Sequence, residues 1–281
     1  MKDDTRNRFR DAREDRTTAH EVPHTPQTDS ASYALAFADD DFLCRKELRP
    51  VRLQLELLKT EMLLDEEGVD STIVLFGGAR IPNPDSAATG RGALHDLSHY
   101  YEEARKFSRL MTEQSLQSGQ SGDNIIVTGG GPGVMEAGNR GAAEAGGRSI
   151  GLSIVLPHEQ APNTYVTPGL SFNFHYFAIR KMHFLMRARA VCVFPGGFGT
   201  MDEMFEALTL IQTGRMQRIP FLLFGQAFWE RIINWSALVD SGTISEQDLT
   251  LFRFVETAEQ AIQAIENWGP ITKRQDIPGR E

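Results

Sequence analysis

Short apolar runs alternate with amphipathic stretches along most of this chain. Runs of apolar residues predict strands at 71–76, 124–128, 149–155, 170–175, 190–194 and 219–224. Helical periodicity between them predicts helices at 94–117, 133–145, 201–213 and 228–239, another that holds Arg180 and Lys181, and a last helix opened by Thr257. Such alternation is typical of a parallel sheet with right-handed crossovers. We therefore expect an α/β fold, a doubly wound parallel sheet (Rossmann-like) of six or seven strands flanked by helices.

The first third of the chain has a different pattern. Residues 1–35 combine charged and polar residues with almost no large apolar ones, which predicts a disordered tail. Apolar residues from Leu43 to Leu63 recur at helical spacing and predict an N-terminal helical extension over 36–70, packed on the sheet or on another subunit. Residues 71–270 form the expected Rossmann-like domain, and 271–281 a C-terminal tail.

Composition narrows the classes of molecule that this chain is expected to bind. A net charge of −9 over 281 residues argues against general binding to nucleic acid or to anionic membranes, because both need a basic face. Cys44 and Cys192 offer no disulfide framework, and no apolar run approaches the ~20 residues of a membrane span. We expect a cytoplasmic protein that binds neither nucleic acid nor membrane.

Two glycine loops follow expected strands and open expected helices. The first is Gly129-Gly130-Gly131-Pro132-Gly133, and the second is Pro195-Gly196-Gly197-Phe198-Gly199-Thr200. Glycine lets backbone amides approach a phosphate, and a helix N-terminus adds unpaired N–H groups and a positive dipole end. Ligands of open α/β sheets bind where such loops lie, at the carboxyl ends of the strands. The pair predicts a site for a phosphorylated ligand, although each loop by itself could serve only as a tight turn.

Neither loop matches the common nucleotide-binding templates. Val134 stands where a dinucleotide motif needs its last glycine, and the chain has no Gly-Lys dipeptide for a P-loop. Thr200 and Glu203 have the spacing of a helix capping box, and they also place a carboxylate in the crevice. Glu136 has the same two interpretations, since an acid in the first turn complements the helix dipole.

Basic residues and histidines complete the candidate chemistry. Arg180 and Lys181 lie just after an expected strand, either as solvated charges or as partners of a phosphate or purine. His175 and His183 flank them and could reach the site. His95 and His99 lie four residues apart without a third metal ligand, so we interpret them as an exposed helix face and expect no metal site.

The segment from Pro195 to Glu203 resembles the PGGxGTxxE signature of the LOG ("Lonely Guy") family. Members of that family are cytokinin riboside 5′-monophosphate phosphoribohydrolases, often labelled lysine decarboxylases. The first glycine loop resembles the family's glycine-rich loop, and Arg180 and Lys181 resemble its Arg-Lys pair, 23 residues before the motif glutamate. The likeness covers roughly residues 72–240, which would make 71–270 a nucleotide-binding catalytic domain.

The resemblance implies a catalytic pair, Arg180 and Glu203. It also implies a larger set of ligand-binding residues: Gly129, Gly130, Gly131, Gly133, Lys181, Gly196, Gly197, Gly199, Thr200 and Thr209. To this set we add Arg80, which follows the first expected strand, and Glu136, which follows the first glycine loop. Pro162 departs from the family, whose short members carry a ligand-contacting glutamate there, and this difference bears on base preference. The long N-terminal extension resembles a larger bacterial subgroup, so we expect a homo-oligomer, either a dimer or a hexamer of dimeric units.

The expected reaction is hydrolysis of the N-glycosidic bond of AMP or an N6-modified AMP, without a cofactor. Glu203 would stabilise the oxocarbenium-like state and orient or deprotonate water, while the loops grip the 5′-phosphate. The alternative is a non-catalytic carrier of a nucleotide or of the molybdenum cofactor. Lysine decarboxylation is disfavoured, because it needs a pyridoxal phosphate lysine and Lys181 lies in no recognisable pyridoxal signature.

Overall fold

The structure of the protein is a computed structural model that describes residues 9–85, 92–157 and 161–268. The chain divides into two compact units, residues 1–58 and 59–281. The division falls inside a helix, whereas the sequence suggested boundaries near residues 35 and 70. The expected C-terminal tail, 271–281, lies outside the described residues.

The first unit is built from short helical segments. Helix α1 (Ala12–His20) is capped by the Asp11 side chain and buries none of its residues, although disorder was expected there. Helix α2 (Asp40–Leu43) is followed by α3 (Arg49–Glu66), which continues into the second unit. The expected helical extension is therefore divided near Cys44, where α2 ends.

A seven-stranded sheet organises the second unit. Its order is β4-β3-β2-β1-β5-β6-β7, and all neighbouring strands in it are parallel. The strands are β1 (Thr72–Phe76), β2 (Ile125–Thr128), β3 (Ser149–Ile154), β4 (Ser171–Phe174), β5 (Ala188–Val193), β6 (Phe221–Phe224) and β7 (Arg253–Val255). The strand order reverses between β1 and β5, so a ligand crevice is expected at the carboxyl ends of these two strands. The α/β, doubly wound expectation is confirmed.

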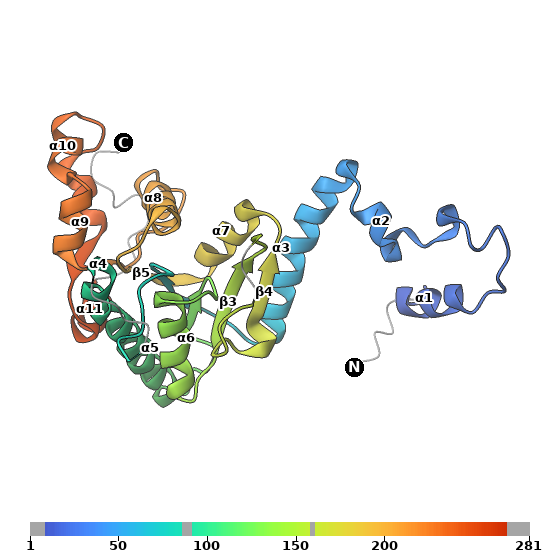
Figure 1. The fold of residues 1–281 in the computed structure, drawn as a ribbon, viewed down its shortest axis with the longest axis horizontal. Coiled ribbons are helices and arrows are strands. Elements are labelled where there is room, and N and C mark those ends of the chain that lie inside the picture. Colours follow the sequence, from blue (N-terminus) through green and yellow to red (C-terminus); the bar gives the residue numbers. More distant parts are fainter. Residues whose placement is uncertain (1–8, 86–91, 158–160, 269–281) are drawn as a thin grey trace. The chain divides into compact units, whose positions relative to one another are not determined.

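The helices cover both faces of the sheet. They are α4 (Ala93–Asp96), α5 (His99–Gln117), α6 (Val134–Glu144), α7 (Phe177–Met186), α8 (Phe198–Gln212), α9 (Gln226–Ile232), α10 (Trp235–Asp240) and α11 (Ala258–Glu266). Right-handed crossovers put α5 and α6 on one face and α7 and α8 on the other, an arrangement that Figure 1 shows. Among the described residues, none of the helices is long and apolar enough to cross a membrane.

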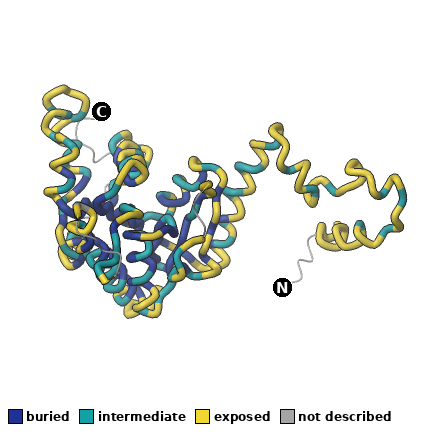
Figure 2. Tube along the Cα trace, in the orientation of Figure 1, coloured by how far each residue is buried: buried dark blue, intermediate teal, exposed yellow. Residues whose placement is uncertain are grey.

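The core lies between the sheet and the helices α5, α6 and α11. Figure 2 shows the buried residues concentrated along the strands. Ile73, Leu75, Ile126, Cys192 and Leu222 form its centre, and each is fully buried. The five-residue run of β1 is buried throughout, as expected for a central strand covered on both faces.

Local differences from the sequence prediction have identifiable causes. The helix expected at 94–117 is broken after Asp96, and α5 begins at His99. Strand β7 was missed because it has only three residues and too short a pattern to recognise. Thr257 caps α11 as expected, accepting a hydrogen bond from the Gln260 backbone amide.

Candidate active site

The first glycine loop, residues 129–133, is held from beneath by buried polar side chains. The Gly130 amide donates to Thr128 Oγ1 (2.9 Å), whose hydroxyl donates to Asn139 Oδ1 (2.7 Å). Asn163 Nδ2 donates to Asn139 Oδ1 (2.9 Å) and to the carbonyl oxygens of Gly130 and Gly131, both at 3.0 Å. Asn139 is completely buried. The loop is therefore fixed before any ligand arrives, which reduces the entropy cost of binding.

Two of its glycines lie close to other parts of the chain, and the backbone requires a glycine at Gly133. Gly133, the N-cap of α6, has φ 69°, and a Cβ there would lie 2.8 Å from the carbonyl carbon of Ala79. A Cβ on Gly129 would lie 2.7 Å from Arg180 Nη2. The second approach shows that the guanidinium of Arg180 packs directly against the backbone of the loop.

Arg180 lies in the first turn of α7 and is anchored to the sheet. Its Nε donates to the Leu152 carbonyl oxygen of β3 (2.7 Å), and its Cζ lies 5.2 Å from the ring centroid of Phe184. The Arg180 amide donates to the Tyr176 carbonyl oxygen, which places the residue at the start of the helix. These contacts fix the plane of the guanidinium beside the first glycine loop.

The second glycine loop, residues 195–200, ends in α8. Gly197 is the N-cap of that helix and has no side chain to cap it. Because α8 begins at Phe198, Thr200 lies in its first turn, where it is buried. A Cβ on Gly196 would lie 2.6 Å from Thr200 Cβ, so the threonine packs directly against the loop backbone. The capping-box interpretation of Thr200 and Glu203 is wrong, because the helix begins at Phe198, earlier than that motif requires.

The backbone also joins the second loop to the end of β1. The Gly78 amide donates to the Pro195 carbonyl oxygen (2.9 Å), and the Val134 amide donates to the Gly78 carbonyl oxygen (3.3 Å). The loop after β1 is thus bonded to both glycine loops. The three loops form one continuous edge at the reversal of strand order.

Glu203 lies on α8 within a cluster of charged side chains. Burial raises the pKa of Glu203 to about 7, although nearby Lys181 and Arg180 act to lower it and Glu206 and Asp202 act to raise it. Lys181 Nζ lies 2.8 Å from Asp202 Oδ2 and 2.9 Å from Glu206 Oε2. Burial by itself lowers the pKa of Lys181, but its hydrogen bonds to Asp202 and Glu206 prevail and the pKa is raised. A carboxyl group that titrates near neutral pH beside two permanent cations is suited to acid–base chemistry.

Other candidate residues lie less close to this cluster. Glu136, in the first turn of α6, accepts a hydrogen bond from Tyr101 Oη (2.7 Å). Arg80 is exposed in the loop after β1. Thr209 is exposed and donates to the Phe205 carbonyl oxygen. It follows Glu203 by six residues, about 240° around α8, so this chain alone does not bring the two side chains together.

Of the histidines considered as candidates, His183 faces away from the crevice. His183 is buried, with Nδ1 3.2 Å from Glu61 Oε1 of α3, so it packs behind α7 and does not face the site as we had considered. Glu61 and Asp65 also pair with Arg187 Nη2, at 3.1 and 2.7 Å, which ties the end of α7 to this segment. His175 is exposed, as are His95 and His99. The described residues hold no group of three potential metal ligands.

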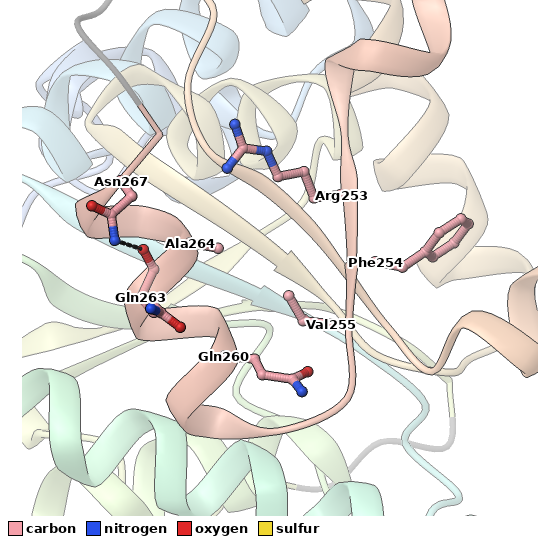
Figure 3. Close-up of a pocket in the computed structure, with 7 residues that line it drawn as sticks. All are labelled: Arg253, Phe254, Val255, Gln260, Gln263, Ala264 and Asn267. Carbon is pink, nitrogen blue, oxygen red and sulfur yellow. Dashed lines mark hydrogen bonds between the residues drawn. The ribbon is translucent and has the colours of Figure 1, made fainter.

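Two hollows accompany the sheet. A cavity of about 160 Å³ adjoins the first glycine loop and is lined by Gly130 and Gly131 with Ser153, Pro162 and Phe172 among others. A larger, open hollow of about 590 Å³ lies at the far edge of the sheet, between β7 and α11. Figure 3 shows that its lining consists of Arg253, Asn267 and uncharged side chains, which lack the acid–base groups of the Glu203 cluster. Of these two, the smaller cavity is the one that adjoins a glycine loop.

Sequence reasoning missed several residues that build the site. Asn139 and Asn163 carry the network under the first loop, and Asp202 and Glu206 flank Glu203. A polar residue at an apolar position of the helix was a usable signal for Asn139. Asn163 had no such signal, because it lies in an irregular loop.

Residues 135–265 match the family model described as "Possible lysine decarboxylase". Cytokinin riboside 5′-monophosphate phosphoribohydrolase LOG5 of Arabidopsis thaliana is 24% identical over 151 residues, 53% of this chain and 65% of the relative, which is less than two thirds of its length. LOG2 of the same plant is 23% identical over 174 residues, covering 61% of this chain and 77% of the relative. Among solved structures, the molybdenum cofactor binding protein of Rippkaea orientalis aligns with a TM-score of 0.47 at 18% identity, over 71% of this chain and 97% of that one. The family match and the curated relatives confirm the resemblance to the LOG family, whose model covers residues 135–265 of this chain.

Proposed function

We propose that this chain hydrolyses the N-glycosidic bond of a nucleoside 5′-monophosphate, giving a free base and ribose 5-phosphate. The substrate class is AMP or an N6-modified AMP such as a cytokinin riboside monophosphate. The observation that carries the proposal is Glu203, a largely buried carboxyl group with a pKa raised to about 7, flanked by Arg180 and Lys181 and next to a glycine loop. The names of the LOG relatives describe the same reaction in those proteins and support the proposal.

The chemistry requires a group that stabilises a cationic sugar. Cleavage of the C1′–N bond leaves positive charge on the ribosyl ring, and the bonding electrons leave with the base. The Glu203 carboxylate stabilises that charge and accepts a proton from the attacking water, whose oxygen forms the new bond to C1′. The departing base takes up a proton, so the products are the neutral base and ribose 5-phosphate.

The loops and Arg180 supply binding energy away from the reacting carbon. Backbone amides of the glycine loops and the N-terminus of α8 suit a 5′-phosphate dianion. Arg180 is positioned by Leu152 and Phe184 to contact phosphate or base. The cavity of about 160 Å³ beside Gly130 and Gly131 offers room for the base. Interactions with these remote groups position the ribosyl carbon against Glu203.

The alternatives fit the site less well. A pyridoxal-dependent decarboxylase needs a lysine whose neutral amine forms a Schiff base, whereas Lys181 is held as an ammonium by two carboxylates. A carrier of a nucleotide or of the molybdenum cofactor needs no acid–base group, and Glu203 would then have no role. The titrating carboxyl group favours an enzyme.

The test is base release from AMP and from isopentenyladenosine monophosphate, followed by chromatography. We expect wild type to release base and Glu203→Gln to be slower by on the order of 10²-fold or more. Glu259→Gln is the matched control, since Glu259 lies on α11 and pairs with Lys106 away from the crevice. Tight nucleotide binding with no base release by wild type would refute the enzyme proposal and favour a carrier.

We also propose that the chain assembles as a homo-oligomer, a dimer or a hexamer of dimeric units. The exposed apolar residues Leu55, Leu58 and Met62 of α3 support association. Sedimentation of the purified protein tests it, and a monomer at micromolar concentration would contradict it.

A further inference from the structure

We propose that Glu206 is a positioning residue for the reaction: together with Asp202 it holds the ammonium of Lys181 away from Glu203, and so leaves the Glu203 carboxylate free to meet the sugar and the water. The inference rests on the proposed function for its consequence, but its physical content concerns only side chains of this chain. Neither the family resemblance nor the motif assigns Glu206 a role.

The geometry places Lys181 between two acceptors on α8. Asp202 and Glu206 are four residues apart and therefore lie one above the other on the same helix face. The Lys181 ammonium bridges them at 2.8 and 2.9 Å, and its side chain is only 15% exposed. Glu203 is adjacent to Asp202 in the chain and within one turn of Glu206. Lys181, whose charge acts on Glu203, is thus engaged by two other acids of α8.

The charges around Glu203 balance in a way that depends on Glu206. The groups that act on it are Arg180 and Lys181 from α7, and Asp202 and Glu206 from α8. The two positive and two negative charges act in opposite directions, so burial decides the direction of the shift and raises the pKa of Glu203. Loss of Glu206 removes one like charge and one of the two carboxylates that pair with Lys181, so the ammonium is held less firmly away from Glu203.

Both consequences of losing Glu206 change the pKa of Glu203 in the same direction. Removal of a like charge lowers the pKa of Glu203, and a closer Lys181 lowers it further. Removal of Lys181 has the opposite effect, because three carboxylates then share one site with Arg180 alone. A role for Glu206 that was only structural would not lower the pKa of Glu203 when Glu206 is replaced by glutamine, which has nearly the same shape.

The experiment is a titration of Glu203 by carbon-13 NMR in protein labelled at the glutamate side-chain carboxyl carbon. Glu203→Gln identifies the resonance. We expect Glu206→Gln to lower the midpoint by about one pH unit and Lys181→Met to raise it by about as much. Asp202→Asn removes the other carboxylate that pairs with Lys181 and should also lower the midpoint, but less, because this side chain is 59% exposed against 39% for Glu206. Glu259→Gln, which removes a carboxylate of α11 that pairs with Lys106, is the matched control and should leave the midpoint unchanged.

The results separate this inference from the proposed function. An unchanged or higher midpoint in Glu206→Gln overturns the role of Glu206, whatever the enzyme does. A lower midpoint in a protein that releases no base supports the charge arrangement and refutes only the hydrolase proposal. If Glu206→Gln does not fold, Asp202→Asn decides, because an unchanged or higher midpoint in that variant would show that the carboxylates paired with Lys181 do not hold it away from Glu203. In an active enzyme, the acidic limb of the kcat/KM profile should move with the midpoint in each variant.

Discussion

Replacing Asn139 with alanine removes the central group under the first glycine loop. Asn139 Oδ1 accepts hydrogen bonds from Thr128 Oγ1 and Asn163 Nδ2, and its Nδ2 donates to the Ile150 carbonyl oxygen at 3.3 Å. The alanine side chain offers none of these bonds. Asn163 Nδ2 keeps two other acceptors, Gly130 and Gly131, but the buried hydroxyl of Thr128 loses the acceptor to which it donates.

The magnitude follows from this inventory. A buried polar group without a partner costs about 1–3 kcal/mol, and each net hydrogen bond contributes about 1 kcal/mol. One orphaned hydroxyl and the loss of the bond to Ile150 give about 3 kcal/mol. For a domain of this size, that corresponds to a fall in Tm of about 6–12 °C. The loop that Asn139 supports should also bind phosphate less well, so we expect a higher KM with a smaller change in kcat.

Urea unfolding followed by circular dichroism measures the loss of stability, and base release from AMP measures KM. Asn267→Ala is the control, because Asn267 is exposed and its side-chain amide donates to the Gln263 carbonyl oxygen at the end of α11, as Figure 3 shows. We expect the control to remain within about 0.5 kcal/mol of wild type. A loss below about 1 kcal/mol in Asn139→Ala, or a KM unchanged despite a large loss, would refute the reasoning that this network supports the loop.

Three other predictions concern single groups. The pKa of Glu203 is raised from its ordinary 4.5 to about 7, so between these pH values the folded state binds more protons than the unfolded state, and this contribution to stability is lost as pH rises. The free energy of unfolding of Glu203→Gln should therefore increase relative to that of wild type between pH 4.5 and 7. A difference in urea unfolding that stays constant with pH would contradict this prediction. Gly196→Ala should lower the free energy of unfolding by about 1–3 kcal/mol, because the new methyl group meets Thr200. Gly199→Ala, whose methyl group meets nothing within 4 Å, should lower it far less. Equal losses for the two variants in urea unfolding would refute the packing argument. Burial raises the pKa of Cys192, so a thiol reagent should modify only the exposed Cys44 in native protein, and rapid modification of both would show that the core opens.

The sequence was most informative where the residue types at a position are required by the local backbone, as in buried strands and tight loops. Runs such as Ile125 to Thr128 are buried on both faces of a parallel sheet, so their apolar composition alone identifies them as strands. The glycine loops predict places where other atoms lie close to the backbone, and the structure has such close contacts at Gly133 and Gly196. These signals are local, which is why single-sequence reasoning could use them.

Features that depend on distant segments could not be derived in the same way. His183 was weighed as a site residue because it is two positions from Lys181, but a helix turns about 200° over that distance, and the residue is buried against Glu61 instead. The capping interpretation of Thr200 was wrong because the preceding glycines already start the helix at Phe198. The charge balance around Glu203 combines α7 and α8, which no local pattern relates.

The ion pairs that join Arg187 to Glu61 and Asp65 determine how much of the chain can be removed. The contacts described for the two glycine loops, Arg180 and the Glu203 cluster lie between residues 72 and 206, so a shortened protein beginning at residue 59 retains them together with this clamp. A protein beginning at residue 67 retains the same site residues but loses both carboxylates that pair with Arg187 at the C-cap of α7. Two truncations that differ by only eight residues should therefore differ in how firmly they hold α7, the helix that carries Arg180.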